Sequence, residues 1–153
     1  MKFIFFILFT TNLIGYAQVA NCDDIEYING KFCSNDKKPF TGDCISYYST
    51  GKKSFEGSFQ NGYVFGPRKW YYDNGQISQQ MTYEEDHINS TYEINGKVTR
   101  WFKNGKIKQV VNYKFGKLHG DWYEFDVKGK KIKKGSYKDN VLLSGDHYIE
   151  KEI

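Results

Sequence analysis

The sequence has few of the branched aliphatic residues that fill a thick hydrophobic core. Aromatic residues make up 18% of the chain and charged residues 26%, so leucine, isoleucine and valine are correspondingly scarce. A β-sandwich needs those aliphatic side chains between its two sheets. Aromatic rings each bury a large area, and tyrosine keeps a polar tip. The composition therefore favours a single twisted sheet or a shallow curved ribbon that is packed by its rings.

Long apolar runs are confined to the N-terminus. After a basic start, residues 3–9 are apolar, and small residues follow at Gly15 and Ala17. This run is too short to span a bilayer and is typical of a secretory signal peptide. We therefore expect residues 1–17 to be removed before Gln18, which places the mature chain in the periplasm or outside the cell.

Cysteine is also scarce, and the three cysteines are Cys22, Cys33 and Cys44. Disulfides persist after export, and three cysteines allow three single pairings. If residues 31–35 pair antiparallel with residues 43–47, Cys33 faces Cys44, so we favour a disulfide between these two. The cysteine spacings match no zinc pattern, so no metal is expected. As an alternative to soluble export, Cys22 could anchor a lipoprotein, although the residue before it is not the small one that lipidation favours.

The chain does contain an internal repeat. Units begin near residues 42, 66, 96 and 120, and a truncated unit begins at 145. Nine residues after each opening glycine comes a second one: Gly51, Gly75, Gly105 and Gly129. Aromatics stand at two further positions of each unit: Tyr47, Tyr71, Trp101 and Phe125, then Phe59, Tyr83, Tyr113 and Tyr137. A fixed period of this length indicates a stacked array of units.

Each unit is predicted to contain two strands and two turns. The pairs Asn74-Gly75 and Asn104-Gly105 predict two-residue hairpin turns in which both central residues have positive φ. Weaker versions stand at Gly51 and Gly129 in the first and last units. The second turn of each unit follows the late aromatic, as at Asn61-Gly62, Phe115-Gly116 and Asp139-Asn140. The predicted fold is all-β, with tandem hairpins forming one twisted antiparallel meander sheet.

The second strand of each unit alternates in polarity. One side of this strand carries Ile77, Gln79, Met81 and Tyr83 in the second unit, and Ile107, Gln109, Val111 and Tyr113 in the third. Alternation with period two predicts a strand with one buried face. No helical periodicity of useful length follows the N-terminus.

The repeat divides the chain into segments. We expect leading strands with the cysteines at residues 18–41, the repeat array at residues 42–148 and a short tail at residues 149–153. The third unit is delayed by a polar insertion, residues 84–95. This insertion is either a longer hairpin, because surface insertions cost little stability, or a protruding loop that contacts a partner.

The repeat resembles the MORN repeat variant family. The resemblance rests on Gly120, Trp122 and Phe125 followed by a turn glycine and a late tyrosine, and on the entry at residues 39–42. Cys44 and Arg68 stand where the motif has tryptophan. Bacterial members of this family are often labelled YwqK-family antitoxins. The resemblance, over residues 39–148, therefore implies a bacterial binding module of the MORN type with an antitoxin-like role.

Positive charge is concentrated in the second half of the array. Residues 97–138 contain 13 lysines or arginines and 3 acidic residues, a net charge of +10. Such a block attracts an acidic protein or an anionic surface, or alternatively its lysines only protect strand edges and turns from aggregation. We therefore predict a binding face made of aromatic and lysine side chains: Tyr71, Trp101, Trp122, Phe125, Lys103, Lys106 and Lys108. A protein partner is favoured, the alternative is an envelope protein that contacts anionic lipid, and nucleic acid is not expected for an exported chain.

Patterns of catalytic residues are lacking. His87, His119 and His147 fall at unrelated positions of the repeat, so stacking does not gather them. The glycines are explained by turns, which leaves no phosphate-binding loop, and no serine nucleophile elbow is present. We therefore expect no enzymatic activity, no cofactor and no small-molecule substrate.

Overall fold

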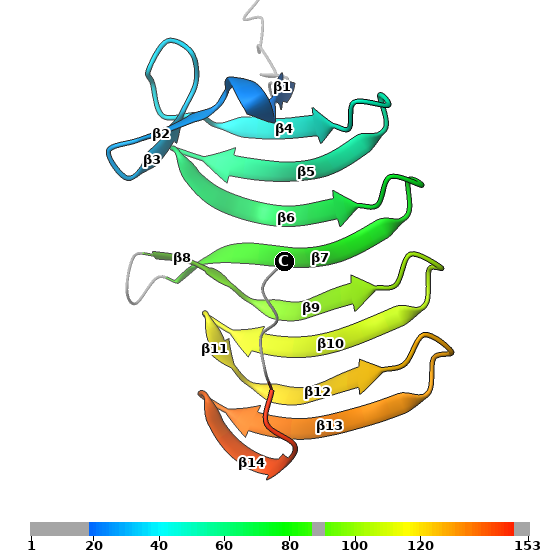
Figure 1. Ribbon diagram of the computed structural model, residues 1–153. Helices are drawn as coiled ribbons and strands as arrows, with labels where there is room; N and C mark the ends of the chain where they lie inside the picture. Colours follow the sequence, from blue (N-terminus) through cyan, green and yellow to red (C-terminus); the bar gives the residue numbers. More distant parts are fainter. Residues whose placement is uncertain (1–18, 87–90, 149–153) are drawn as a thin grey trace, which may run out of the picture.

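In each of the four repeat units, two strands of six to ten residues are joined by a glycine-containing turn, as the repeat predicts. In the computed structural model, which describes residues 19–86 and 91–148, they form one open sheet (Figure 1). The strands are β1 (Val19–Asn21), β2 (Glu26–Ile28), β3 (Lys31–Cys33), β4 (Gly42–Tyr47), β5 (Lys53–Gln60), β6 (Tyr63–Tyr71), β7 (Ile77–Asp86), β8 (Thr91–Ile94), β9 (Gly96–Trp101), β10 (Ile107–Lys114), β11 (Lys117–Leu118), β12 (Gly120–Phe125), β13 (Lys131–Lys138) and β14 (Val141–Gly145).

The sheet is a meander of hairpins, which confirms the predicted fold class. Its strand order is β1-β4-β5-β6-β7-β9-β10-β12-β13-β14, with β8 added to β7 and β11 added to β10. All pairs are antiparallel except β1 with β4. In every unit the opening glycine pairs with the late aromatic: Gly42 with Phe59, Gly66 with Tyr83, Gly96 with Tyr113 and Gly120 with Tyr137. The four units are thus copies of one hairpin.

The first turn of each unit differs from the prediction, whereas the second turn lies where it was predicted. Gly75 and Gly105 have φ of 88° and 82°, but Asn74 and Asn104 do not have positive φ. The amide of Gly75 donates to the carbonyl of Tyr72, whose own amide donates to Gln76, so the loop has three residues and ends in a left-handed glycine. Two-residue turns with positive φ at both positions occur instead at the other end of the strands, for example at Asn61 and Gly62.

A bulge accompanies each three-residue turn and changes which residues share a face. Tyr71 pairs with Ile77 and Trp70 pairs with Gln79, so Ser78 is the extra residue. The same shift occurs in the other three units. The prediction that Ile77 and Ile107 share the buried face of their strands is therefore wrong: Ile107 is 40% exposed, whereas Gln79 and Met81 are buried.

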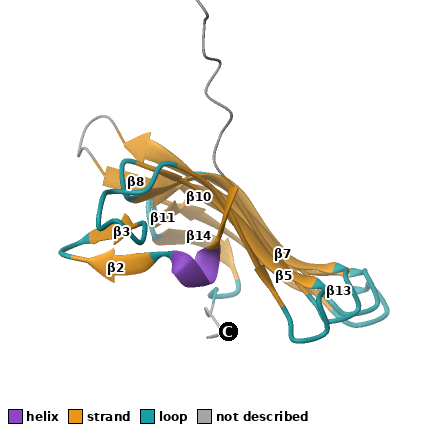
Figure 2. Ribbon diagram, turned by 90° about the horizontal axis from the view of Figure 1, so that it is seen from above, coloured by secondary structure: helices purple, strands orange, loops and turns teal. Residues whose placement is uncertain are grey.

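We call the covered face of the sheet the inner face, and it carries Cys44, Arg68, Val98 and Trp122. The strands bend, and the short 3-10 turn η1 (Cys22–Asp24), the β2–β3 hairpin and residues 146–148 lie on this side (Figure 2). At the first unit, Phe40, Cys44 and Phe59 form one core cluster. At the last unit, Val111, Trp122 and Tyr137 form another, against which Tyr148 packs.

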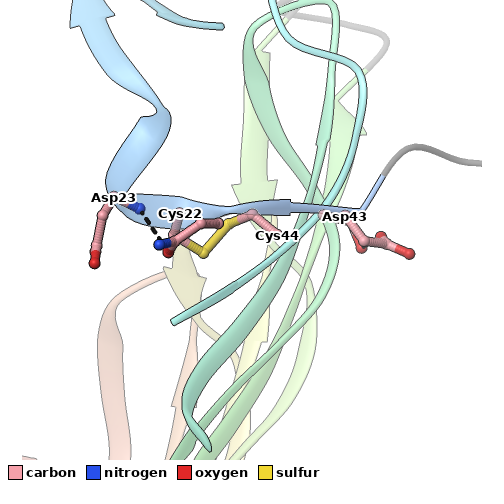
Figure 3. The surroundings of a disulfide bond; sticks show 6 residues. Cys22, Asp23, Asp43 and Cys44 are labelled. Carbon is pink, nitrogen blue, oxygen red and sulfur yellow. Dashed lines mark hydrogen bonds between the residues drawn. A yellow bond between two sulfur atoms is a disulfide. The ribbon is translucent and has the colours of Figure 1, made fainter. Parts of the chain in front are cut away.

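The disulfide joins Cys22 to Cys44, with 5.0 Å between their Cα atoms (Figure 3). The predicted bond between Cys33 and Cys44 is wrong because β3 pairs with β2 and lies in a separate two-stranded sheet. Strand β1 instead pairs parallel with β4, which places η1 and its cysteine beside Cys44. Cys33 is a buried free thiol.

The insertion is a longer hairpin. Strand β7 continues to Asp86 and pairs with β8. The ring of Tyr92 on β8 stacks on Tyr63 with 5.4 Å between centroids, which holds this hairpin against β6. The tip, residues 87–90 with His87, lies outside the described residues.

Candidate binding groove

One row of laterally paired residues crosses the inner face over seven strands. Each member pairs with the next across the sheet, and the row runs Ser46, Phe55, Trp70, Gln79, Arg100, Gln109 and Glu124. All seven line an open groove with a volume of about 560 Å³. Neighbouring strands are about 4.8 Å apart, so this floor is roughly 29 Å long.

The first half of the floor is aromatic. Phe55 and Trp70 pack with 5.1 Å between their ring centroids, in a tilted arrangement. Rings at this separation attract one another beyond the area that they bury. The groove therefore offers a firm apolar surface at the end nearest the first unit.

The second half of the floor is polar and internally bonded. Gln79 is 4% exposed and Gln109 is 8% exposed. Arg100 lies between them, its Nε donating to Gln79 Oε1 at 2.6 Å and its Nη1 to Gln109 Oε1 at 2.5 Å. The same Nη1 donates to the hydroxyl of Tyr148 at 3.0 Å. Because buried polar groups are costly unless bonded, this arrangement fixes the orientation of both amides.

Side chains bridge successive units at the turn end of the groove. The hydroxyl of Tyr48 donates to the carbonyl of Tyr71, and that of Tyr72 to the carbonyl of Trp101, at 2.5 and 2.6 Å. The turn asparagine Asn74 bonds the next turn in the same way, through its amide and the carbonyl of Lys103. These bonds couple each hairpin to the next, so this wall of the groove is preformed.

Arg68 lies beside the aromatic half of the groove. Its guanidinium carbon is 4.8 Å from the ring centroid of Phe55 and 5.4 Å from that of Trp70. Phe59 and Tyr83 complete a four-ring cage, at 5.7 and 5.9 Å. Burial lowers the pKa of Arg68, because it disfavours the charged form, while Tyr83 opposes that shift.

The predicted binding face is not a single face. Trp122 is 2% exposed and belongs to the core of the inner face, where its Nε1 donates to the carbonyl of Asp146. The Tyr71 hydroxyl donates to Glu56 on the opposite, outer face. Phe125 packs against Tyr123, also on that face. The side chains of Trp122, Tyr71 and Phe125 are thus divided between the two faces, because positions two and five of a unit differ by an odd number of residues. Tyr71 and Trp101 nevertheless both line the groove.

The predicted lysines have different surroundings. Lys103 forms an ion pair with Asp73 of the preceding turn at 2.6 Å. Lys106 donates to the carbonyl of Lys128 in the following turn. Lys108 is the bulge residue of its unit, so it lines the groove, where its Nζ lies 6.0 Å from the ring centroid of Phe102. Of the three, Lys108 alone is a lining residue of the groove.

The outer face carries a charged network centred on Glu56. This carboxylate accepts hydrogen bonds from Lys53 at 2.6 Å, Lys69 at 3.0 Å and Tyr71 at 2.6 Å. Burial raises the pKa of Glu56, but these three donors outweigh it and lower the pKa to about 2. Burial and the bond to Glu56 together raise the pKa of Tyr71 to about 12. The carboxylate of Glu56 is therefore charged, and the Lys53, Lys69 and Tyr71 donors are already used in bonds to it.

Sequence reasoning missed the residues that form the groove floor. Gln79 and Gln109 stand at the same position of successive units, and glutamine on the buried side of a strand was the available signal.

No metal-binding group of three or more His, Cys, Asp or Glu residues occurs in residues 19–86 and 91–148. Within the described part of the chain, no helix is long and apolar enough to cross a membrane.

The fold and the groove define a class of protein, a curved all-β repeat scaffold with an open groove on its inner face. Comparison with protein families matches the MORN repeat variant family over residues 40–61, 66–85 and 94–115. The chain is therefore a MORN-repeat protein, a class whose repeats generally mediate binding and are typically non-catalytic. The fourth unit, from Gly120, lies outside the matched ranges but has the same strand pairing as the others. No curated protein and no solved structure gives a significant match.

Proposed function

We propose that this protein is an exported, non-enzymatic binding module that holds an extended segment of a partner protein in the inner-face groove. The observation that carries the proposal is the row of seven paired residues, which crosses seven strands without interruption. A strand-like segment rises about 3.3 Å per residue, so roughly nine residues of a partner span this floor.

The composition of the floor suits a peptide. Aromatic rings supply contact area at one end, and fixed amide and guanidinium groups supply directional hydrogen bonds at the other. Aromatic and arginine side chains are also the residues that contribute most to binding in protein interfaces. A toxic partner would make the protein an immunity protein, in line with its resemblance to antitoxins.

Export is supported by two features. The N-terminal sequence is typical of a signal peptide, and a disulfide between Cys22 and Cys44 suits an oxidising compartment. In that bond the sulfur of Cys22 is already used, which favours a soluble form over a lipoprotein anchored at this residue.

The test is affinity capture from envelope and culture fractions with residues 18–153 and two matched variants. Ser78→Tyr fills the groove at the bulge of β7, and Gln80→Tyr adds the same ring to β7 at a residue that does not line the groove. We expect the parent and Gln80→Tyr to capture one stoichiometric protein, and Ser78→Tyr to capture at least tenfold less of it. All three proteins should have the same melting temperature.

If Ser78→Tyr captures as much partner as the parent does, the partner binds outside the groove. The dependence on salt tests the alternative function, contact with anionic lipid. Binding to anionic lipid vesicles falls steeply as the salt concentration rises, whereas binding of a segment in the groove depends on salt only weakly. Vesicle binding without any captured protein would overturn the proposal in favour of an envelope-associated role.

A further inference from the structure

Arg68 occupies the position that the tryptophan of the motif holds in the fourth unit. Both residues stand two positions after the opening glycine of their units, and each pairs with a glycine of an adjacent strand, Arg68 with Gly57 of the preceding strand and Trp122 with Gly135 of the following one. At this position a tryptophan packs as an ordinary core residue, 2% exposed. Packing alone therefore does not require an arginine at this position.

The guanidinium of Arg68 has no acceptor among the described residues. Its Nε is buried and makes no hydrogen bond. Its two terminal nitrogens are accessible to solvent and form no hydrogen bond or ion pair with a described residue. The surrounding side chains are rings, not carboxylates. A largely buried charge without a counter-ion is costly, and an anionic ligand with a planar pair of oxygens removes that cost.

The cage and the groove share two walls. Phe55 and Trp70 both contact Arg68 and line the groove. Trp70 follows Arg68 by two residues on β6, so the two side chains lie next to each other on the inner face. A segment that passes over these two rings therefore brings its own side chains within reach of the guanidinium.

We propose that Arg68 is a specificity site that binds the carboxylate of an acidic side chain in the partner segment held by the groove. This inference rests on the proposed function. The floor continues on both sides of Trp70, from Ser46 to Glu124, so a segment crosses this point without ending there. An internal glutamate or aspartate, and not a chain terminus, is thus the group that reaches sideways to Arg68.

Synthetic nine-residue serine–alanine peptides test the site directly. One carries a central glutamate with both ends blocked, the second has glutamine in its place, and the third has glutamine and a free C-terminus. The readout is the Nε–Hε resonance of Arg68 in a ¹⁵N spectrum of residues 18–153. We expect a saturable shift with the glutamate peptide and an affinity at least tenfold lower for the other two.

Equal shifts for the glutamate and glutamine peptides, or shifts that never saturate, would overturn the proposal. A stronger response to the peptide with the free C-terminus would also overturn it, because the site would then recognise the end of a chain.

Two variants extend the test to the captured partner. Arg68→Trp installs the side chain that the fourth unit uses, so we expect it to fold and to lose at least tenfold of the partner. Arg68→Lys keeps the charge but not the planar fork and should retain an intermediate amount.

The two proposals fail in different ways. If Arg68→Trp captures as much partner as the parent protein does, while Ser78→Tyr captures less, then the partner binds in the groove and the proposed carboxylate site is wrong. If no partner is captured at all, the peptide titration still decides whether Arg68 recognises a carboxylate.

Discussion

The guanidinium of Arg68 lies over Gly57, with its Nε 3.4 Å from the point where a Cβ of residue 57 would stand. Trp122 lies over Gly135 in the same way, and its Nε1 is among the atoms nearest to an added Cβ there. These two glycines do not have positive φ. At Gly57 the ring of Phe55 on the same strand comes closer still, to 2.6 Å from that point, whereas at Gly135 the close side chain is that of Trp122 on the neighbouring strand. At both positions glycine serves packing and not turn geometry.

The first prediction concerns Gly135. Gly135→Ala adds a methyl group that must displace Trp122 or the carbonyl of Asp146, which are rigidly held by the hydrogen bond between them. We expect a loss of about 1–3 kcal/mol in the free energy of unfolding, measured in urea. Ser136→Ala, on the adjacent position of β13, should change stability by less than about 0.5 kcal/mol. If both variants match the parent, Trp122 moves aside for the added methyl group without a loss of stability, which contradicts the prediction.

The second prediction concerns the left-handed glycine of the three-residue turn. Gly105 has φ of 82°, a conformation that costs other residues about 1–2 kcal/mol and a β-branched residue more. Gly105→Val should therefore lower the melting temperature clearly, whereas Gly105→Asn should lower it less, because asparagine tolerates this region. The same melting temperature for both variants would show that the turn adopts another conformation.

The sequence alone predicts the sheet because the pattern of one hairpin occurs in it four times. Glycines and aromatics in fixed register determine strand lengths, turn positions and the single layer, and all of these depend on neighbouring residues. The turn asparagines lie in turns as predicted, but they do not have the positive φ that the prediction gave as the reason. Asn74 accepts from the amide of Gln76 and donates to the carbonyl of Lys103, and this bridging between units is invisible without the structure.

The groove could not be predicted because it depends on a bulge and on register across seven strands. A single extra residue such as Ser78 places the side chains before it on the opposite face of the sheet from the one that strict alternation predicts. A pattern with period two does not reveal this change. The disulfide was missed for a related reason. Parallel pairing of β1 with β4 joins segments about twenty residues apart, and local pairing rules favour the nearer Cys33.

The third prediction concerns the cysteines. The bond between Cys22 and Cys44 closes a loop over a sequence separation of 22 residues, which in the loop-entropy account stabilises the fold by about 3 kcal/mol. Cys44→Ser should lose most of this stabilisation. Cys33→Ser should keep the disulfide, detected by mass spectrometry of the unreduced digest as a linked pair of peptides with Cys22 and Cys44. A linked pair that contains Cys33 would instead restore the sequence-based prediction.

The last prediction concerns pH. The pKa of Glu56 is lowered from 4.5 to about 2 in the folded protein, so its contribution to stability is complete above pH 4.5 and is lost as pH falls toward 2. Because the carboxylate is partly solvated, we expect Glu56→Gln to cost about 1 kcal/mol at pH 7. Urea unfolding at pH 7 and at pH 2 should show the parent and Glu56→Gln differing at pH 7 and converging at pH 2. The three donors explain the direction: a protonated carboxyl no longer attracts Lys53 and Lys69, and glutamine then resembles it in charge and shape. A difference between the two proteins that persists at pH 2 would mean that the amide disturbs packing on the outer face, and that the charge of Glu56 is not what stabilises it.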